Sequence, residues 1–287
     1  MKKNLLLTTL LLAILQLGMA QKDTTIAPKS DTIKIAGIKI IIKNNRKNNG
    51  SDTTSNDTTK PRTYSYSKAN KKPRNVATNY FAIDLGFNNY KDATNYTSVA
   101  TTTMLRPTAS TAAPKDADFK LNTGKSINFN IWIVQQKLNL YKHILNLKYG
   151  IGLEIYNFRF KSPLTFKDEN PSYIIKDSIS FSKNKLTVKY VTVPLMFTIS
   201  PSGKKGFSLS AGASVSYRYG AHTKQKSSAR GKEKDRGDFD LEPFKIALVG
   251  DIGYKSYRLF ASYSLNTLHS KGLNLTPYSV GLRFHDW

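Results

Sequence analysis

The chain has 287 residues and a formal net charge of +25, from 44 Lys and Arg against 19 Asp and Glu. Apolar residues make up 39%, below the roughly 45–50% of an average globular domain, while aromatic residues reach 11% with sixteen Tyr and fourteen Phe. There is no Cys, which excludes thiolate metal sites, a Cys nucleophile and a disulfide framework.

Residues 1–20 have the features of a secretory signal peptide. A positively charged start precedes an apolar stretch from Leu5 to Leu17, and Gly18 and Ala20 place small residues at the −3 and −1 positions for cleavage. The stretch is shorter than the roughly 20 apolar residues of a membrane-spanning helix, so we predict cleavage before Gln21 and export. No later apolar run is long enough to span a membrane, and the chain could therefore cross one only as a closed barrel.

Residues 21–78 are rich in Thr, Asn, Asp, Ser and Lys, with thirteen basic and four acidic side chains. Such a segment buries too little apolar surface to offset chain entropy, so we predict a disordered arm. Within it, residues 31–42 alternate on both sides of Ala36-Gly37 and predict a short hairpin. Because an isolated hairpin is marginal in water, we expect it to need a partner or a surface.

From Asn79 onward the dominant signal is a period of two residues. Between Phe207 and Tyr219 the odd positions are apolar or aromatic and the even positions are mostly Ser or Gly, which helix periodicity cannot produce. Seven other segments show the same pattern with more noise. The eight predicted strands are centred on residues 81–87, 127–133, 145–155, 191–199, 207–219, 244–252, 257–263 and 278–284.

Three features favour a transmembrane barrel over a soluble lipocalin-like barrel, whose apolar face points inward. Phe207 and Tyr217 bracket an aliphatic middle, and ten residues at about 3.3 Å, tilted by roughly 45°, span about 24 Å, close to the apolar band of an outer-membrane barrel. The opposite face is small and polar, which suits a narrow interior. Long and short connections alternate, as in barrels with long external loops and short periplasmic turns.

We therefore predict an all-β fold: an eight-stranded antiparallel transmembrane up-and-down β-barrel over residues 79–287, with a disordered N-terminal periplasmic arm. The predicted location is a bacterial outer membrane. Both chain termini should then be periplasmic, because the first and last strands each have their free end on the side of the short turns.

Short motifs resemble a known family. Residues 190–197, YVTVPLMF, and residues 278–284, YSVGLRF, are similar to strands of Bacteroidetes-type outer-membrane β-barrel proteins, the PorT-like or OmpA-like eight-stranded barrels. The segment 31–42 also resembles one that precedes such barrels. The resemblance covers roughly residues 79–287. It implies a structural, adaptor or assembly role, associated with secretion as in PorT-like relatives.

Charged residues occur on the polar parity of the predicted strands and should point into the lumen. Five bases would face three acids there, so we expect internal water or further partners in addition to direct ion pairs. Since eight strands leave little bore, a lumen largely plugged by salt bridges is favoured over a small-solute channel. These residues are Asp84, Lys148, Glu154, Arg218, Lys245, Asp251, Arg258 and Arg283.

The sequence predicts no catalytic, cofactor-binding or metal-binding residue, and we expect no enzyme. The histidines are His143, His222, His269 and His285. His222 and His269 should lie near the external rim, in loops that also carry serines and acids, which leaves a lipid A-modifying enzyme as a weaker alternative. No spacing ties these groups into a triad, and no two histidines stand at ligand spacing.

The positive charge predicts attraction to acidic partners. A nucleic-acid partner does not suit an exported barrel without a recognition fold. Outer-membrane lipid and the phosphates of surface glycolipid suit it better, although general solvation of the loops explains the charge equally well. Residues 21–78 could also bind a periplasmic protein by strand addition. The sequence sets no oligomeric state.

Overall fold

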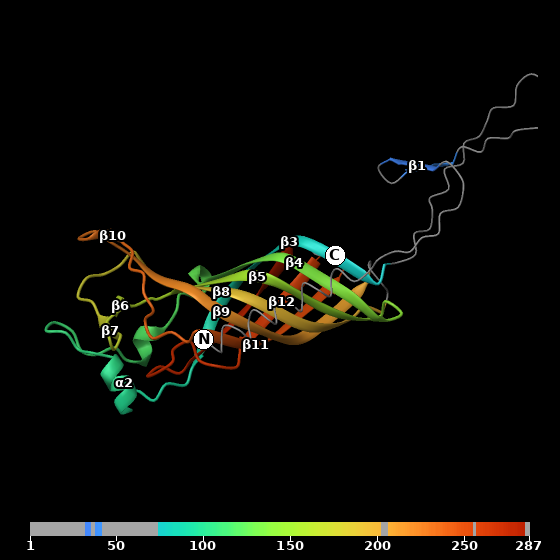
Figure 1. The fold of residues 1–287 in the computed structure, drawn as a ribbon. Helices are drawn as coiled ribbons and strands as arrows, with labels where there is room; N and C mark the ends of the chain where they lie inside the picture. The colour runs from blue at the N-terminus through green and yellow to red at the C-terminus, as the bar shows by residue number, and fades with distance from the viewer. Residues whose placement is uncertain (1–31, 36–37, 42–73, 202–205, 255–256, 285–287) are drawn as a thin grey trace, which may run out of the picture. The chain divides into compact units, whose positions relative to one another are not determined.

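The computed structural model describes residues 32–35, 38–41, 74–201, 206–254 and 257–284 (Figure 1). The chain divides into two compact units, Met1–Lys72 and Pro73–Trp287. In the first unit, β1 (Thr32–Ile35) pairs antiparallel with β2 (Ile38–Ile41), so the predicted strand pair within residues 31–42 is present. The predicted signal peptide, the predicted disorder of the remaining arm and His285 lie outside the described residues.

The second unit contains a closed ring of eight antiparallel strands. Each strand pairs with the next one along the chain, and the last pairs with the first, which confirms the predicted up-and-down barrel. Its first strand begins at Val76, three residues before the predicted start. The strands are β3 (Val76–Asp92), β4 (Ile127–Tyr141), β5 (Leu145–Arg159), β8 (Lys183–Ile199), β9 (Phe207–Ser227), β11 (Phe244–Tyr254), β12 (Tyr257–Ser264) and β13 (Leu275–Phe284).

The outward face of the ring is an apolar belt, because successive side chains of a strand point to opposite faces. On β9, Leu209 and Val215 are 43% and 53% exposed, whereas Ser210 and Ser214 between them are buried. Phe207 and Tyr217 lie outward on the same strand, one on either side of these residues. An exposed apolar face between aromatic residues is the surface of a barrel that lies in lipid. Within the described ranges, no helix is long and apolar enough to cross a membrane.

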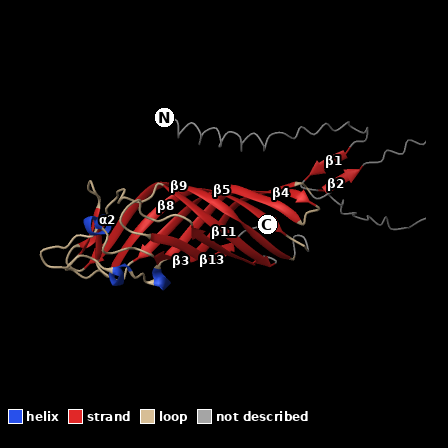
Figure 2. Cartoon of the chain, turned by 90° about the horizontal axis from the view of Figure 1, so that it is seen from below, coloured by secondary structure: helices blue, strands red, loops and turns tan. Residues whose placement is uncertain are grey.

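The two ends of the barrel differ. Short turns join the strands at one end, the turn end, while four long loops gather at the other, the loop end (Figures 1 and 2). These loops are residues 93–126, 160–182, 228–243 and 265–274, called the first to fourth loop below. They contain α2 (Val99–Met104), η1 (Asp116–Phe119), η2 (Thr123–Lys125), β6 (Leu164–Lys167), β7 (Tyr173–Lys176) and β10 (Gly231–Glu233).

Strands β8 and β9 continue beyond the apolar belt towards the loop end, where β10 pairs with β9 (Figure 1). Their register shifts at Lys189 and Tyr190, because Lys189 is opposite Gly220 while Tyr190 is opposite Arg218. The extra residue, Tyr219, changes which parity of β9 faces outward. A bulge of this kind re-aims the following side chains.

Candidate functional site

The middle of the lumen contains a cluster of ion pairs around Asp251 on β11. Its carboxylate contacts Lys148 Nζ at 3.3 Å, Arg258 Nη1 at 2.5 Å and Arg283 Nη1 at 3.2 Å. Ser210 Oγ donates to the same group at 2.8 Å. All five residues are buried and come from five different strands. One carboxylate thus joins distant walls of the barrel.

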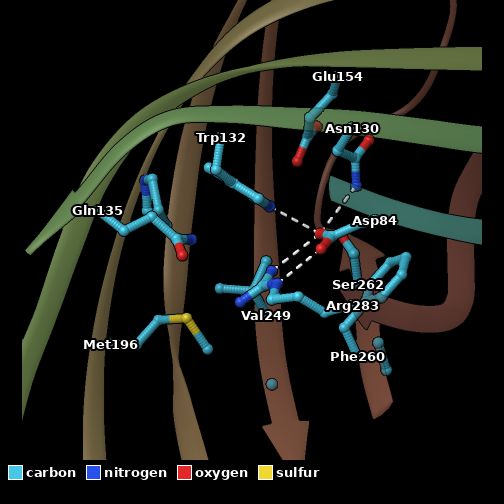
Figure 3. A pocket seen from close by; sticks show the side chains of 13 residues that line it. Asp84, Asn130, Trp132, Gln135, Glu154, Met196, Val249, Phe260, Ser262 and Arg283 are labelled. Atoms are coloured by element: carbon cyan, nitrogen blue, oxygen red, sulfur yellow. Dashed lines mark hydrogen bonds and ion pairs between the residues drawn. The ribbon is translucent and has the colours of Figure 1, made fainter. Parts of the chain in front are cut away.

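Arg283 extends this cluster to Asp84 on β3 (Figure 3). Its Nε donates to Asp84 Oδ1 at 2.6 Å and its Nη2 to Oδ2 at 2.8 Å, the two-pronged geometry that suits guanidinium and carboxylate. Trp132 Nε1 also donates to Asp84 Oδ2, at 2.7 Å, and the Arg283 guanidinium lies 5.3 Å from the Trp132 ring. The Asp84 side chain is fully enclosed by these donors.

A second buried pair lies nearer the loop end. Lys245 on β11 is ion-paired with Glu154 on β5, and its Nζ donates to Tyr156 Oη at 3.2 Å. The same ammonium lies 4.6 Å from the Tyr156 ring centre and 5.3 Å from that of Tyr190. Aromatic faces attract a cation, so both rings stabilise this ammonium. In this layer the interior of the barrel changes from ion pairs to aromatic side chains.

Seven of the eight charged residues predicted to line the lumen are buried there, and Arg218 is the exception. It is ion-paired with Asp238 of the third loop and donates to the carbonyl of Leu241 at 3.0 Å. Four bases therefore face three acids in the lumen, not five against three as predicted. The excess base is accommodated because Asp251 accepts from three cations.

The free space beside this network is small. A cavity of about 20 Å³ lies next to Asp84 and Arg283, with Met196 and Phe260 also in its wall (Figure 3). That volume holds about one water molecule. The described part of the lumen at this level is therefore filled by protein side chains.

The loop end is closed by a hydrophobic core that the sequence did not predict. Residues from all four loops pack against inward-facing side chains from the upper parts of the strands. We call the four loops with this core the loop cap. Its buried members are Met104, Leu105, Phe119, Leu121, Tyr156, Phe158, Phe160, Leu164, Phe166, Ile174, Leu186, Val188, Tyr190, Ala221, Phe239, Leu241, Leu268, Leu273 and Leu275.

Polar contacts join neighbouring loops around this core. Lys176 Nζ of the second loop contacts Asp118 of the first at 2.8 Å. Asp168 of the second loop accepts the backbone N–H groups of Asp238 and Phe239 in the third, both at 3.0 Å. The third and fourth loops are joined by backbone hydrogen bonds, and Thr101 Oγ1 of the first loop donates to the fourth at 2.7 Å. The cap is therefore one connected layer.

A wider cleft of about 280 Å³ opens at the rim, between the end of β3 and the first loop. Phe119 and Leu121 in its wall belong to the core of the loop cap. Acids and bases both line it, so its charge selects no particular ligand. The cleft lining is Asn89, Tyr90, Asp92, Asp116, Phe119, Lys120, Leu121 and Lys161.

The histidines expected at the external rim lie in different surroundings. His269 is buried in the loop cap with its ring stacked on Phe166 at 6.4 Å, and neither ring nitrogen has a hydrogen-bond partner among the described residues. Burial lowers its pKa to about 3. For His222, burial and then the nearby cations Lys234 and Lys189 lower the pKa to about 4. The described contacts link neither ring to a serine or an acid, as a triad requires.

Among the described residues there is no group of three or more His, Asp or Glu side chains that could bind a metal ion. The features that the sequence did locate are the lumen charges. The cap core and the basic residues around His222 required the folded structure.

The family comparison agrees with this architecture. The sequence model of the outer membrane protein beta-barrel domain matches residues 81–270. Among solved structures, Ail, the attachment invasion locus protein of Yersinia pestis, matches with 13% identity and a TM-score of 0.28, over 72% of this chain and 98% of that one. A second Ail structure, in complex with the heparin analogue sucrose octasulfate, matches with 12% identity and the same coverage and TM-score. No curated protein matches the chain.

Proposed function

The chain belongs to the outer membrane protein beta-barrel domain family, and on that premise we propose that it is a closed barrel that acts by binding partners at its ends. It serves as a structural, adaptor or assembly factor, without enzymatic activity and without conducting solutes. The loop end faces the outside of the cell, and both termini are periplasmic. Fold alone would not decide this, because the same barrels host different activities.

The observation that carries the proposal is the double closure of the lumen. Ion pairs around Asp251 fill the middle of the barrel, and the hydrophobic core of the loop cap fills the loop end. Each layer alone leaves little room for water. A conducting path would need both layers to move, at the cost of separating buried charges and exposing apolar side chains.

Planar-bilayer recording tests this proposal against the small-solute channel. Pure full-length protein should give no stable conductance, while a general porin reconstituted in the same lipid gives its usual steps. Reproducible porin-sized steps from the pure protein would contradict the closed barrel. A lipid A-modifying enzyme would instead change the mass of lipid A in the same membranes, and we expect no change.

Labelling in intact cells tests the proposed orientation. The chain has no Cys, so single cysteines can be introduced without background. Ser228→Cys, in an exposed turn of the loop end, should react with a membrane-impermeant maleimide. Lys142→Cys, in a turn at the other end, should react only after the outer membrane is opened. The reverse labelling pattern would show that the barrel has the opposite orientation in the membrane.

The periplasmic arm is the proposed docking site for a protein partner. Its support is the β1–β2 hairpin, in which Ile33 is opposite Ile40 and Ile35 opposite Ile38. Both strands are edges of a two-stranded sheet, and a strand edge invites addition of another strand; the basic arm also suits an acidic surface. The resemblance to PorT-like proteins suggests a partner associated with secretion.

Deletion of residues 21–72 behind the signal peptide tests the arm. It ends before β3, whose first residue is Val76, so the barrel should insert and remain heat-modifiable. Capture of a periplasmic partner after mild cross-linking should fall. Ile33→Asp with Ile40→Asp should reproduce the loss, whereas Lys34→Gln with Lys39→Gln tests charge separately. Full capture by the truncated protein would make the arm a linker.

A further inference from the structure

The outer face of the extended sheet formed by β5, β8, β9 and β10 is unusually basic. Above the apolar belt the inner face of this sheet packs on the loop cap, since Leu186 and Val188 of β8 and Thr223 of β9 are buried. The alternating side chains therefore point away from the cap. Those on or beside this outer face, which we call the basic face, are Arg159, Lys183, Lys185, Lys189, Lys224, Lys226, Lys232, Lys234 and Arg236.

Strand register aligns these cations in rows across the sheet. Lys226 on β9 lies opposite Lys183 on one side and opposite Lys232 on the other. Lys185 lies opposite Lys224 and, on its other side, opposite Arg159. Side chains directly opposite each other are close neighbours, and like charges in such positions repel. Folding alone would not favour this arrangement.

Acidic partners do not offset the repulsion. In the described part of the chain, none of the nine cations of the basic face forms a salt bridge; Lys185 Nζ donates to the Asn157 amide oxygen at 2.5 Å. Some cations elsewhere at the loop end are paired with acids, as Lys176 is with Asp118 and Arg230 with Asp177. Other exposed lysines of the loop end, such as Lys125 and Lys271, are not in a described salt bridge either. What sets the basic face apart is that strand register places its cations in adjacent rows.

The pKa values of two lysines on the basic face are lowered in these surroundings. Burial, followed by the charges of Lys183, Lys224 and Arg159, lowers the pKa of Lys185 to about 8. Burial and the neighbouring cations also lower the pKa of Lys183. A bound anion would favour the charged form of both lysines and relieve the repulsion.

The height of the basic face relative to the apolar belt indicates which part of the membrane it contacts. Lys189 is opposite Gly220, which follows Tyr219, an exposed residue at the upper edge of the apolar belt. From Lys189 to Lys183 a strand rising about 3.3 Å per residue and tilted by roughly 45° gains about 14 Å in height. The face is therefore continuous with the lipid-facing wall and rises beside it through the layer where lipid headgroups lie.

We propose that the basic face binds the phosphate groups of glycolipids in the outer leaflet. The inference rests on the orientation proposed above and names a partner for the loop end. Lysine ammonium groups in rows supply several donors for phosphate oxygens at successive heights. Such contacts hold the extended sheet against the membrane surface and anchor the cap beside the headgroups.

Reconstitution of the full-length protein tests this proposal with a matched control. One variant neutralises the face, Lys185→Gln with Lys224→Gln and Lys226→Gln. The control neutralises three exposed lysines of the loop end off the face, Lys91→Gln with Lys125→Gln and Lys271→Gln. Binding is measured in phosphatidylcholine nanodiscs containing bisphosphorylated lipid A or its dephosphorylated form, by retention of glycolipid on the purified protein.

The wild type and the control should retain the phosphorylated glycolipid, and the face variant should bind it about 100-fold more weakly, roughly a factor of five per lysine at an anionic surface. The face variant should remain folded, because neutralisation removes repulsion. Equal binding by the two variants, or equal retention of the dephosphorylated form, would overturn the proposal. So would stronger binding of soluble polyphosphate than of membrane glycolipid. The labelling of Ser228→Cys in intact cells, described above, tests the orientation separately, so a wrong orientation is distinguished from a basic face that does not bind glycolipid.

Discussion

The middle of the barrel and its loop end are filled by opposite chemistry, although the same strands build both. On β8, Leu195 and Phe197 face outward in the middle while Thr192 and Thr198 face the lumen. Towards the loop end the pattern inverts: the lysines of the basic face point outward and Leu186 is fully buried inside. Alternation continues along the whole strand, but the apolar side changes from outside to inside.

The surroundings of the barrel explain the inversion. In lipid, the outer face must be apolar, so the polar and charged residues are left to a narrow interior where they must pair with one another. In water, the outer face can be charged and the interior can hold an ordinary hydrophobic core. Different substitutions should therefore destabilise the ionic middle and the hydrophobic loop end, and each can be tested separately.

The largest effect is expected from breaking the ionic layer. Asp251→Ala removes the carboxylate shared by Lys148, Arg258 and Arg283 and should cost about 3–5 kcal/mol, because it leaves buried cations without this partner. Urea unfolding in detergent, followed by heat-modified gel mobility, measures the loss. Ser279→Ala is the control, since its buried hydroxyl has no hydrogen-bond partner among the described residues, and it should be nearly neutral. Equal stability of the two variants would contradict the network.

In the loop cap, Phe158→Ala should cost about 3 kcal/mol, within the range for deleting a buried aromatic side chain. Phe158 is fully buried, and its ring contacts those of Tyr90 and Tyr156. Limited proteolysis of the loops should accelerate while the membrane strands stay protected. Val99→Ala, at an exposed site on α2 that is 82% accessible, should leave the cleavage rate unchanged. An unchanged rate of loop cleavage in Phe158→Ala would mean that the cap is not a cooperative core.

On the lipid face, Ala213→Arg should cost roughly 2–4 kcal/mol near the membrane midplane. Ala213→Leu at the same exposed position should be tolerated, and Ser214→Arg next to it should act through crowding of the lumen. The energies come from unfolding in lipid vesicles. A spin label at position 213 that reported water instead of lipid would show that the two faces had been assigned the wrong way round.

Acid should weaken the cap more than the barrel, through His269. Its pKa is about 3 in the folded protein, against an ordinary value near 6.5. The contribution of the neutral ring to the free energy of unfolding is therefore fully present above pH 6.5 and declines as the pH falls towards 3. At pH 5 the loss should be about 2 kcal/mol. His269→Phe should remove this pH dependence from loop proteolysis, while His143→Gln at the turn end should retain it. Identical pH profiles for all three proteins would contradict the burial of a neutral ring.

The barrel could be predicted from the sequence because its signal is local. Two-residue periodicity located all eight strands, and the same parity placed Asp84, Lys148 and Asp251 in the lumen. Arg218 follows that parity but lies at the rim, where Asp238 of a loop attracts it. Its partner is twenty residues away, and no periodicity reports such a contact.

The cap and the basic face could not be predicted because they depend on contacts between distant segments. Apolar residues such as Leu164 and Phe239 occur singly in polar loops, and their shared core appears only when four loops meet. The rows of lysines depend on register, which the bulge at Tyr219 shifts by one residue.

The central claim, a lumen sealed by two layers, is tested most directly by cysteine accessibility. Ser216 is buried between the ionic layer and the cap, whereas Ser228 is exposed in a loop-end turn. With the full-length protein in vesicles, a small water-soluble thiol reagent should modify Ser228→Cys fully. It should modify Ser216→Cys slower by orders of magnitude, and faster once Phe158→Ala is added. Equally rapid modification at both positions in the otherwise unaltered protein would contradict the sealed lumen.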